Sequence, residues 1–595
     1  MLLTPKQKEI VKIYAALSKK NGEYPTRADL LSSGISRDKV RDHFGNMEKL
    51  KVASRKENPK SFAKIDKKEL ATLTPKIPHA LNDFTKEAIG NIVKENDFKE
   101  GTFFITAVSP TSYLDWSEQD FVRAENGEDV LAENLFEPGF AAIQNFLKRN
   151  KAEMVLLPMP AHVKGLQKQP QHYDPKLKEF RKSFATEYTF NPHLKAIEAH
   201  LNPQQANPIT GLRRLRVHKY TGSYEKGQEI KRAKTSLIIG HSKQMMEVSP
   251  TGNASHPRIV HSTGCITKPS YLRNRVGMIA NEDHMLGGLI VEVRGDVFWM
   301  RQVQFDVYNG SFVDLGTRYN ANGSIAIERA EAMKIGDIHF GHHDQRALGG
   351  LYELFDLVKP KRIYMEDLFD ATSVSHHLEK KRLTQAIISR DMKYFADLPS
   401  EIAYAKECLE DFWSHCPKDA DIIATASNHP EHVMRYVEEG RYFNDCVPNR
   451  VIGHEMWLEG YRGQNPLQLR LDPKLRMIWS DQNADDYVEG VQMNVHGHLG
   501  TNGSRGNKIG HELAHGDVMT AHSHTPSIFH GCFTVGHMTH ERHGYNNGPS
   551  TWILCCGAVY KGGMKQLYMI VKGTAFKPKH KKSETPKKNS SRKPS

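Results

Sequence analysis

Five short apolar runs between residues 326 and 573 are each followed at once by side chains that can bind a metal ion, and this pattern constrains the fold more than any other feature. Helix-like stretches such as HDQRALGGLYELFDLV separate the runs. Strands that alternate with helices predict a layered α/β domain, and in such sheets ligands bind outside the carboxyl ends of the strands. The polar residues at these ends are Asp337 with His339, Asp367, Asn428 with His429, His496 with His498, and His522 with His524.

These residue types suit a pair of divalent metal ions. Two metals about 3.5–4 Å apart need a bridging carboxylate together with nitrogen and oxygen ligands, which imidazole, carboxylate and amide groups provide. D-x-H and H-x-H place both side chains on one side of an extended chain. With 31 histidines, a single H-x-H is expected by chance on a surface loop, but five such strand ends together favour a metal centre. After the first turn come His342, His343 and Asp344, which we expect to face substrate, support the ligands or cap the next helix.

The order of the motifs resembles that of the calcineurin-like metallophosphoesterases, a superfamily that includes repair nucleases of the Mre-eleven and SbcD type. G-D-I-H-F-G is intact from Gly336 to Gly341. The other motifs keep the ligand types but lose glycines, with Glu366 in E-D-L-F-D, Ser427 and Pro430 in S-N-H-P, and Ala521 in A-H-S-H. The resemblance covers residues 326–573. It implies an α/β fold of four layers, a β-sandwich flanked by helices, in which STWILCCGAVYKGGMKQLYMIVKG supplies two further strands.

The same resemblance implies a set of metal ligands. One metal would be held by Asp337, His339 and His524, the other by Asn428, His496 and His522, and Asp367 would bridge the two. We expect His496 rather than His498 because it comes first after the strand. The implied cofactor is two divalent metal ions, with Mn expected and Mg, Fe or Zn as alternatives.

Catalytic and substrate-binding roles follow from the resemblance as well. His429 would protonate the leaving oxygen or steady the phosphate, and the nucleophile would be a water or hydroxide held by the metals. The loop after His496 is rich in glycine and could approach a phosphate backbone closely. The expected substrate contacts are His498, Arg505 and His342.

The rest of the chain predicts three further parts. Residues 1–56 read as a small helical unit of helix-turn-helix type, in which TPKQKEIVKIYAALSKK is the first helix; a three-helix unit without a nucleic-acid role remains the alternative. A linker over 57–77 leads into a mixed α/β accessory domain over 78–325, with a basic patch in GLRRLRVHKY that either contacts phosphate or forms an ordinary solvated face. Residues 574–595 form a basic tail that we expect to be disordered.

Charge and cysteine content indicate which partners and which cellular compartment to expect. The net charge is +13 and the pI is about 9.1, which suits a polyanionic partner. About half of that surplus lies in the tail, where the residues from Lys577 to Ser595 include eight Lys or Arg and one Glu. Seven scattered cysteines without a C-x-x-C pair indicate reduced thiols. No apolar run approaches the ~18 residues of a membrane span, and the N-terminus lacks a signal peptide, so we expect a cytoplasmic protein.

These features together resemble the pre-early DNA-degrading proteins of tailed siphophages. That resemblance implies a Mn-dependent nuclease that degrades double-stranded host DNA in the cytoplasm of the infected cell. A phosphomonoesterase or nucleotidase of the same superfamily is the first alternative, with the accessory region as a lid or as the interface of a homo-oligomer. A DNA-binding scaffold with an inactive site is the second. Salt dependence separates nuclease from nucleotidase, because a protein that neutralises many phosphates loses affinity steeply with salt.

Overall fold

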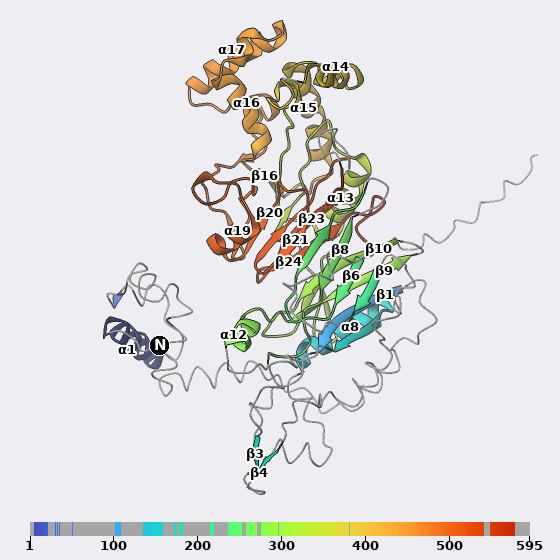
Figure 1. Cartoon of the computed structure of the whole chain (residues 1–595), viewed down its shortest axis with the longest axis vertical. Helices are drawn as coiled ribbons and strands as arrows, with labels where there is room; N and C mark the ends of the chain where they lie inside the picture. The colour runs from blue at the N-terminus through green and yellow to red at the C-terminus, as the bar shows by residue number, and fades with distance from the viewer. Residues whose placement is uncertain are drawn as a thin grey trace, which may run out of the picture. The chain divides into compact units, whose positions relative to one another are not determined.

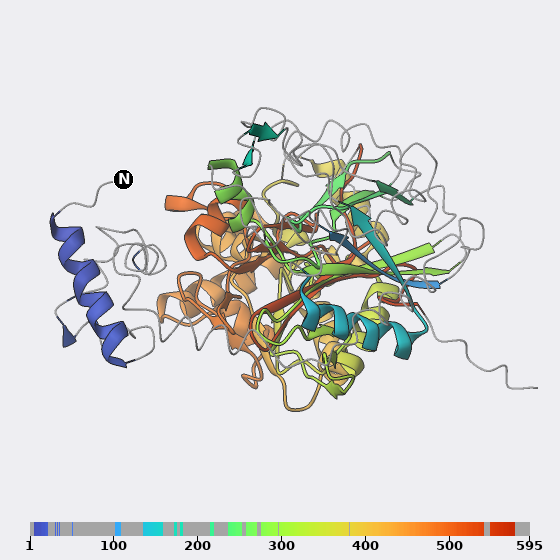
Figure 2. The same ribbon diagram turned by 90° about the horizontal axis from the view of Figure 1, so that it is seen from below.

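The structure is a computed structural model, and it describes only part of the chain. The described residues are 5–21, 101–108, 135–158, 236–252, 257–269, 275–294, 297–379, 381–540 and 548–577, with short pieces at 172–174, 179–181 and 215–218 and a few residues between 30 and 50. The chain divides into two compact units, Met1–Phe84 and Thr85–Ser595. Two ribbon views at right angles show them (Figures 1 and 2).

The first unit contains the predicted first helix, α1 (Pro5–Asn21). Its apolar residues at helical spacing are buried or half-buried on one face. They pack with a few residues further along the chain in a small cluster made by Ile10, Val11, Tyr14, Ala15, Leu30, Ile35 and Leu50. Most of the predicted second and third helices, and the predicted linker over 57–77, lie outside the described residues.

A six-stranded sheet in the second unit carries three of the five predicted strand ends. Its order is β17-β16-β15-β14-β23-β24. Four strands are parallel, namely β14 (Ala332–Lys334), β15 (Arg362–Met365), β16 (Asp421–Ala424) and β17 (Ile478–Trp479), and two are antiparallel, β23 (Cys555–Tyr560) and β24 (Met564–Met569). Parallel neighbours require crossovers. The crossover helices are α13 (Gln345–Val358), α14 (Arg382–Asp391), α15 (Leu398–His415), α16 (Asn428–Glu438), α17 (Val447–Tyr461) and α18 (Pro466–Leu471), with the short 3₁₀ turns η6 (Thr372–Val374), η7 (Lys393–Phe395) and η8 (Arg441–Asn444).

A nine-stranded sheet carries the other two strand ends. Its order is β18-β19-β20-β22-β21-β7-β8-β6-β5. The strands are β18 (Tyr487–Val488), β19 (Val491–Gln492), β20 (Val518–Thr520), β21 (Ser527–Phe529), β22 (Cys532–Thr534), β5 (Leu215–His218), β6 (Ser236–Ile239), β7 (Met246–Ser249) and β8 (Arg258–Ser262), with η9 (Thr501–Gly503) and α19 (Lys508–His515) between β19 and β20. Strands from both sides of residue 325 therefore share one sheet, joined where Ile528 pairs with Met246. The division into domains at residue 325 stays a prediction, and it falls inside one compact unit.

A four-stranded sheet, β10-β9-β1-β2, completes the large elements. Its strands are β1 (Gly101–Val108), β2 (Glu153–Pro158) and the hairpin of β9 (Gly287–Arg294) with β10 (Val297–Gln304). The helix α8 (Glu137–Asn150) packs on this sheet through Ile143 and Phe146. Smaller elements are α12 (Arg275–Glu282), β3 (His172–Asp174) paired with β4 (Glu179–Arg181), and the sheet of β11 (Phe312–Asp314), β12 (Thr317–Tyr319) and β13 (Ile325–Ile327).

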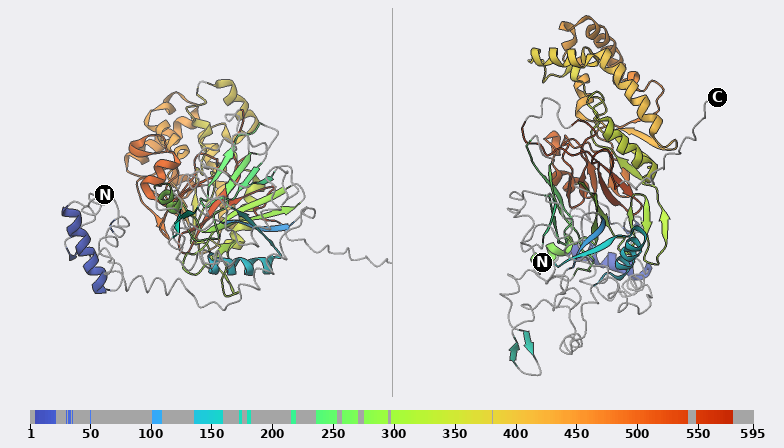
Figure 3. Two further views of the ribbon diagram at one scale, coloured as in Figure 1. Left: turned by 60° about the horizontal axis from the view of Figure 1, so that its bottom comes forward. Right: turned by 90° about the vertical axis from the view of Figure 1, so that its right-hand side faces the viewer.

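Two apolar cores define the layers of this unit. One core lies between the sheets and joins residues such as Tyr364 of the six-stranded sheet to Met519 of the nine-stranded sheet. The other lies between the six-stranded sheet and its helices, where Leu351 of α13 and Leu409 of α15 are fully buried. Each such side chain contributes roughly 1.5–3 kcal/mol of apolar burial. The unit is therefore mixed α/β, with sheets packed against each other and helices outside them (Figure 3).

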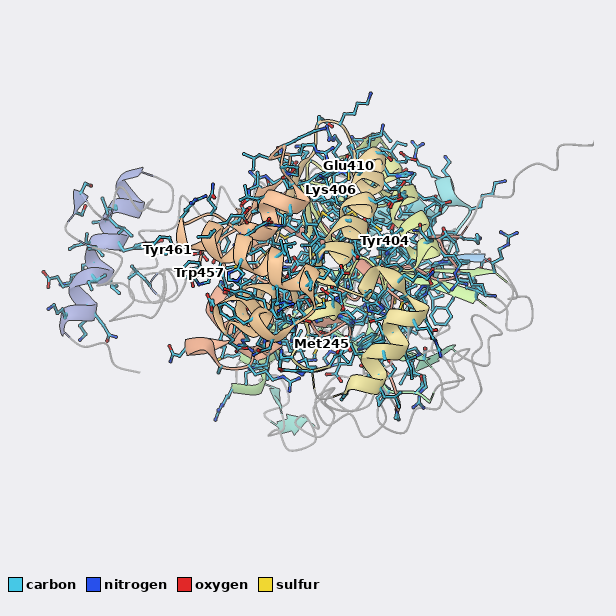
Figure 4. The ribbon with its side chains drawn as sticks, turned by 90° about the horizontal axis from the view of Figure 1, so that it is seen from above. Met245, Tyr404, Lys406, Glu410, Trp457 and Tyr461 are labelled. Carbon is cyan, nitrogen blue, oxygen red and sulfur yellow. The ribbon has the colours of Figure 1, made fainter. Side chains whose placement is uncertain are left out.

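The helices α14–α17 gather at one end of this unit (Figure 1). Seen from that end, the labelled side chains Tyr404, Lys406 and Glu410 come from α15, and Trp457 and Tyr461 from α17 (Figure 4). Among these helices, α16 begins at Asn428, shortly after the carboxyl end of β16. This helix therefore borders the region in which the predicted site lies.

The end of the chain corrects one prediction. Thr574–Phe576 were assigned to the basic tail, but Ala575 is buried in the helix-side core, and Trp299 Nε1 donates a hydrogen bond of 2.9 Å to the Thr574 carbonyl. The packed chain thus continues to Lys577, and residues 578–595 lie outside the described part. Of the GLRRLRVHKY patch, the structure describes only the backbone of β5.

Two further findings bear on the sequence predictions. All seven cysteines are free thiols, as their spacing predicted. Within the described residues, no helix is both long enough and apolar enough to cross a membrane.

Candidate metal centre

The five predicted strand ends converge at one place. The loops after β14 and β15 run side by side, because His339 N donates to the Asp367 carbonyl at 2.8 Å and Ile338 N donates to the Glu366 carbonyl at 3.1 Å. The loops after β19 and β20 are joined in the same way, by Ala521 N and the His496 carbonyl at 2.7 Å. Parallel pairing of the strands therefore brings their carboxyl ends, and the polar residues there, to a common edge.

The first predicted ligand set lies together and is fully buried. His524 Nε2 is 2.9 Å from Asp337 Oδ2 and 3.2 Å from His339 Nε2, and the ligand atoms of all three residues lie within 4.8 Å of one another. Metal–ligand bonds of ~2.0–2.2 Å put neighbouring ligand atoms about 3–3.5 Å apart. Asp337 Oδ2 is buried, and its close neighbours among the described residues include two histidine nitrogens rather than a lysine or arginine. The spacing and the buried carboxylate both fit a bound cation.

The second predicted set is equally compact. His496 Nε2 lies 3.0 Å from Asn428 Oδ1 and 3.2 Å from Asp367 Oδ2. His522 Nδ1 lies 2.9 Å from the same Asn428 oxygen. Asp367 Oδ2 is also 3.8 Å from His339 Nε2 of the first set. One carboxylate oxygen thus faces both groups, as a bridging ligand would.

The hydrogen-bond partners of His496 also indicate a positive charge in the second set. Its Nδ1 is 2.8 Å from Glu366 Oε2, so Nδ1 carries a proton that it donates to the carboxylate. In the neutral ring Nε2 then has a lone pair, yet it faces the oxygens of Asn428 and Asp367, which are also acceptors. A positive charge must lie among these three atoms, either as a second proton on the ring or as a metal ion.

Glu366 itself is held from the other side by a buried lysine. Lys334 Nζ is 2.5 Å from Glu366 Oε1 and donates to the Val495 carbonyl at 3.2 Å. Both side chains of the pair are 0% exposed. A histidine that donates its far N–H to a fixed carboxylate is oriented for metal binding and is more basic at its near nitrogen. The chain Lys334–Glu366–His496 therefore supports one ligand of the second set.

The backbone is in an unfavourable conformation at four of the predicted ligands. His339, Asp367, His522 and His524 have φ of 47°, 39°, 64° and 55°, in the left-handed region that costs a non-glycine residue roughly 1–2 kcal/mol. Such residues cluster at functional sites, because the surrounding structure holds them there. At Gly336 the chain passes so close to its neighbour that a Cβ would lie 2.7 Å from the Gly536 carbonyl, so glycine is required.

Local electrostatics keep Asp337, His339 and His522 in their binding forms, whereas burial of His496 is outweighed by Asp367 and Glu366, which raise its pKa well above its usual value. Burial acts to raise the pKa of Asp337, but the charge and hydrogen bond of His524 outweigh it and hold that pKa below its usual value. Burial lowers the pKa of His522 to about 4, and the charge on His496 adds to this effect. Burial and the nearby His429 likewise lower the pKa of His339. A carboxylate and neutral imidazoles are the forms that bind divalent metals.

His429 lies beside both groups and is tied to Asp370. His429 Nδ1 donates to the Asp370 carbonyl at 2.8 Å and lies 3.3 Å from its carboxylate, and its ring is 4.4 Å from that of His339. Burial acts to lower the pKa of His429, but Asp367 and Asp370 outweigh it and raise the pKa to about 10. With Nδ1 committed to Asp370, Nε2 is the atom that can hold or pass a proton to a bound substrate.

The three predicted substrate contacts are placed differently. His342 Nε2 is 3.3 Å from Thr372 Oγ1 and 3.6 Å from Asp370, and the His498 ring is 5.3 Å from that of His496. Arg505 is exposed, and no hydrogen bond or ion pair joins its side chain to the centre among the described residues. The structure thus brings His342 and His498 to the centre and leaves Arg505 on the loop surface.

The other polar residues of the first motif take supporting positions. Asp344 caps α13 by accepting from Arg346 N at 2.8 Å, which confirms the expected helix cap. His343 is buried and its Nδ1 accepts from Gly341 N at 3.2 Å, so it braces the turn.

Sequence reasoning missed Lys334, Glu366 and Asp370 as parts of this centre. Asp370 joins His339 and His429, since its Oδ1 lies 2.8 Å from His339 Nδ1, and it stands three residues after Asp367 in the second motif. The departure from glycine at Glu366 was a usable signal, because a charged residue directly after a buried strand needs a partner.

Comparisons with known proteins give one distant relative. The chain is 28% identical over 370 residues to Protein A1 of Escherichia phage T5, which corresponds to 57% of this chain and 64% of that protein. The chain thus matches a little under two thirds of the relative's length. The aligned part is longer than residues 326–573, so the similarity extends beyond the region that carries the site. No family model matches the chain, and no solved structure matches it.

Proposed function

We propose that this protein is a metal-dependent DNA nuclease that hydrolyses phosphodiester bonds at the centre described above. One observation carries the proposal: two compact groups of buried and half-buried ligands, which share the Asp367 carboxylate, lie at the carboxyl ends of parallel strands. Asp337, His339 and His524 would hold one divalent ion, and Asn428, His496 and His522 the other, with Mn as the expected metal. Bound there, such ions would activate a water and neutralise charge on a phosphate. We further propose the calcineurin-like fold for residues 326–573.

The chain's own residues complete the proposed reaction. His429, held through Nδ1 by Asp370, would pass a proton from Nε2 to the leaving oxygen. Glu366 would keep the Nε2 lone pair of His496 directed to the metal. His342 and His498, at the border of the centre, would contact the substrate beside the scissile phosphate.

DNA as the substrate is supported by features outside the centre. The net charge of +13 suits a polyanion. The relative is a phage protein, which agrees with the proposed role in degrading double-stranded host DNA in the cytoplasm of an infected cell. A phosphomonoesterase would need neither the basic surplus nor the predicted helix-turn-helix unit.

The test is incubation of the purified full chain with plasmid, linear duplex and a mononucleotide, each with Mn, Mg, Zn or EDTA. We expect Mn-dependent cleavage of both DNAs and no release of phosphate from the mononucleotide. Asp367→Asn should abolish cleavage with an unchanged far-UV circular dichroism spectrum, whereas the exposed Asp391→Asn should cleave as the wild type does. Phosphate release without DNA cleavage would assign a nucleotidase instead, and full activity of Asp367→Asn would refute the two-metal centre.

A further inference from the structure

Three histidines form a separate cluster beside the proposed centre. His376 and His377 follow η6, and His432 lies on α16 one turn after Asn428. One ring nitrogen from each of the three lies within 4.8 Å of the others. The ring centroids are 3.8 Å apart for His376 and His377, 5.0 Å for His376 and His432, and 5.9 Å for His377 and His432. Nitrogen atoms this close are within reach of a single ion.

The segment that carries the two adjacent histidines is firmly held. The buried Glu401 accepts hydrogen bonds of 2.9 Å from the backbone N–H groups of Thr372 and Ser373. Arg441 donates to the Val374 carbonyl at 3.1 Å. A site on a fixed backbone loses little entropy when it binds an ion, so this cluster is better suited to metal than histidines on an unanchored loop.

A ring nitrogen of this cluster also lacks a hydrogen-bond partner within the described part of the chain. His376 Nδ1 is buried and has no hydrogen-bond partner among the described residues. Three imidazoles at this distance repel one another when protonated, so their proximity favours the neutral form that binds metal. The side chain of His377 is exposed, which leaves one side of the cluster open to solvent.

We propose that His376, His377 and His432 form a third metal site, which takes a divalent ion of the Zn²⁺, Co²⁺ or Ni²⁺ class. Imidazole suits these ions, whereas Mg²⁺ and Ca²⁺ prefer oxygen. Three histidines with an open fourth position are a known arrangement for zinc. The site shares no ligand with the two proposed above, although the His432 ring is 5.1 Å from that of His429. The inference does not depend on the proposed function.

The test is a titration of the metal-free full chain with Co²⁺, read by visible absorption and by metal content after desalting. We expect the wild type to bind one equivalent more than His377→Ala or His432→Ala, or to bind that equivalent at least about tenfold more tightly. The band of four-coordinate Co²⁺ should weaken in parallel. His454→Ala is the matched control, because it removes an exposed histidine of the same helical region that packs on Tyr442 and Phe443.

A second variant separates this site from the proposed centre. Asp337→Asn removes a buried ligand of the first set and should lower the Co²⁺ bound there while the third equivalent stays. Equal stoichiometry and equal spectra in wild type, His377→Ala and His432→Ala would overturn the proposal, whatever Asp337→Asn does. Circular dichroism confirms that each variant is folded before metal is added.

Discussion

Replacing Glu366 with glutamine should weaken metal binding although Glu366 is not expected to touch a metal. The carboxylate accepts from Lys334 Nζ at 2.5 Å on one side and lies 2.8 Å from His496 Nδ1 on the other. An amide has one acceptor oxygen, so its NH₂ group must face one of these two donors. Lys334 loses its counter-charge in either orientation, and either Lys334 or His496 also loses its hydrogen-bond acceptor.

Two magnitudes follow from this geometry. Loss of a carboxylate that orients a ligating histidine costs about 10–100-fold in metal affinity, or ~1.4–2.7 kcal/mol. Because Lys334 and Glu366 are both 0% exposed, leaving the ammonium unpaired should also cost ~3–5 kcal/mol of folding stability. The double variant Lys334→Met/Glu366→Gln removes the ammonium as well. We expect it to regain most of the stability and to stay about tenfold weaker in metal binding.

Isothermal titration with Mn²⁺ measures the affinity, and urea unfolding of the metal-free protein measures the stability. Glu331→Gln is the control, because Glu331 pairs with Lys361 at the surface, where such pairs contribute at most about 1 kcal/mol. Metal affinity of Glu366→Gln within twofold of the wild type would refute the reasoning. So would a double variant that is no more stable than Glu366→Gln.

Three further predictions concern catalysis, pH and the tail. His429→Ala should lower turnover of a chromogenic phosphodiester by ~10²–10⁴-fold and leave the metal content unchanged by mass spectrometry; loss of metal would make it a ligand. Burial raises the pKa of Glu401 from 4.5 to about 7, and Asp370 adds to this effect. Ionisation of Glu401 therefore removes up to ~3 kcal/mol of folding stability as the pH rises from about 4.5 to 7. Urea midpoints at pH 5 and 8 should show this decline in the wild type and not in Glu401→Gln, and an equal decline in both proteins would contradict the prediction. Residues 578–595 contain seven Lys or Arg and one Glu. Their removal should reduce the slope of log affinity for duplex DNA against log salt concentration by as much as ~6, while hydrolysis of the small phosphodiester persists. Loss of that hydrolysis would show that the tail does more than attract DNA.

The candidate site was predictable wherever the signal was local. An apolar run, a turn and a ligand occur within ten residues at each strand end, so periodicity alone indicated where Asp337 or His524 would lie. Lys334 gave no such signal. It reads as an ordinary polar residue at the end of a strand, and its partners Glu366 and Val495 are 32 and 161 residues away. Which charges end up buried together depends on tertiary pairing, which a single sequence does not reveal.

The fold shows the same limit at a larger scale. Nothing in the sequence indicated where the strands β6, β7 and β8 would pair, because the place of β7 beside β21 depends on pairing across more than 250 residues. A change in composition near residues 57–77 and the basic end of the chain suggested boundaries. The mixed region before residue 326 carried no chemical motif, and it was therefore predicted as a separate domain although its strands continue the sheet that holds β20.

The shared nine-stranded sheet has a consequence for any attempt to shorten the protein. A fragment beginning at residue 326 would keep all seven proposed ligands but lose the strand that covers Ile528. It would leave β21 as an open hydrogen-bonding edge and uncover the face of Met519 and Phe533. Such edges pair with other chains, so this fragment should aggregate even though its proposed ligands are complete. The proposed ligands and the strands before residue 326 therefore have to be kept in one expressed chain.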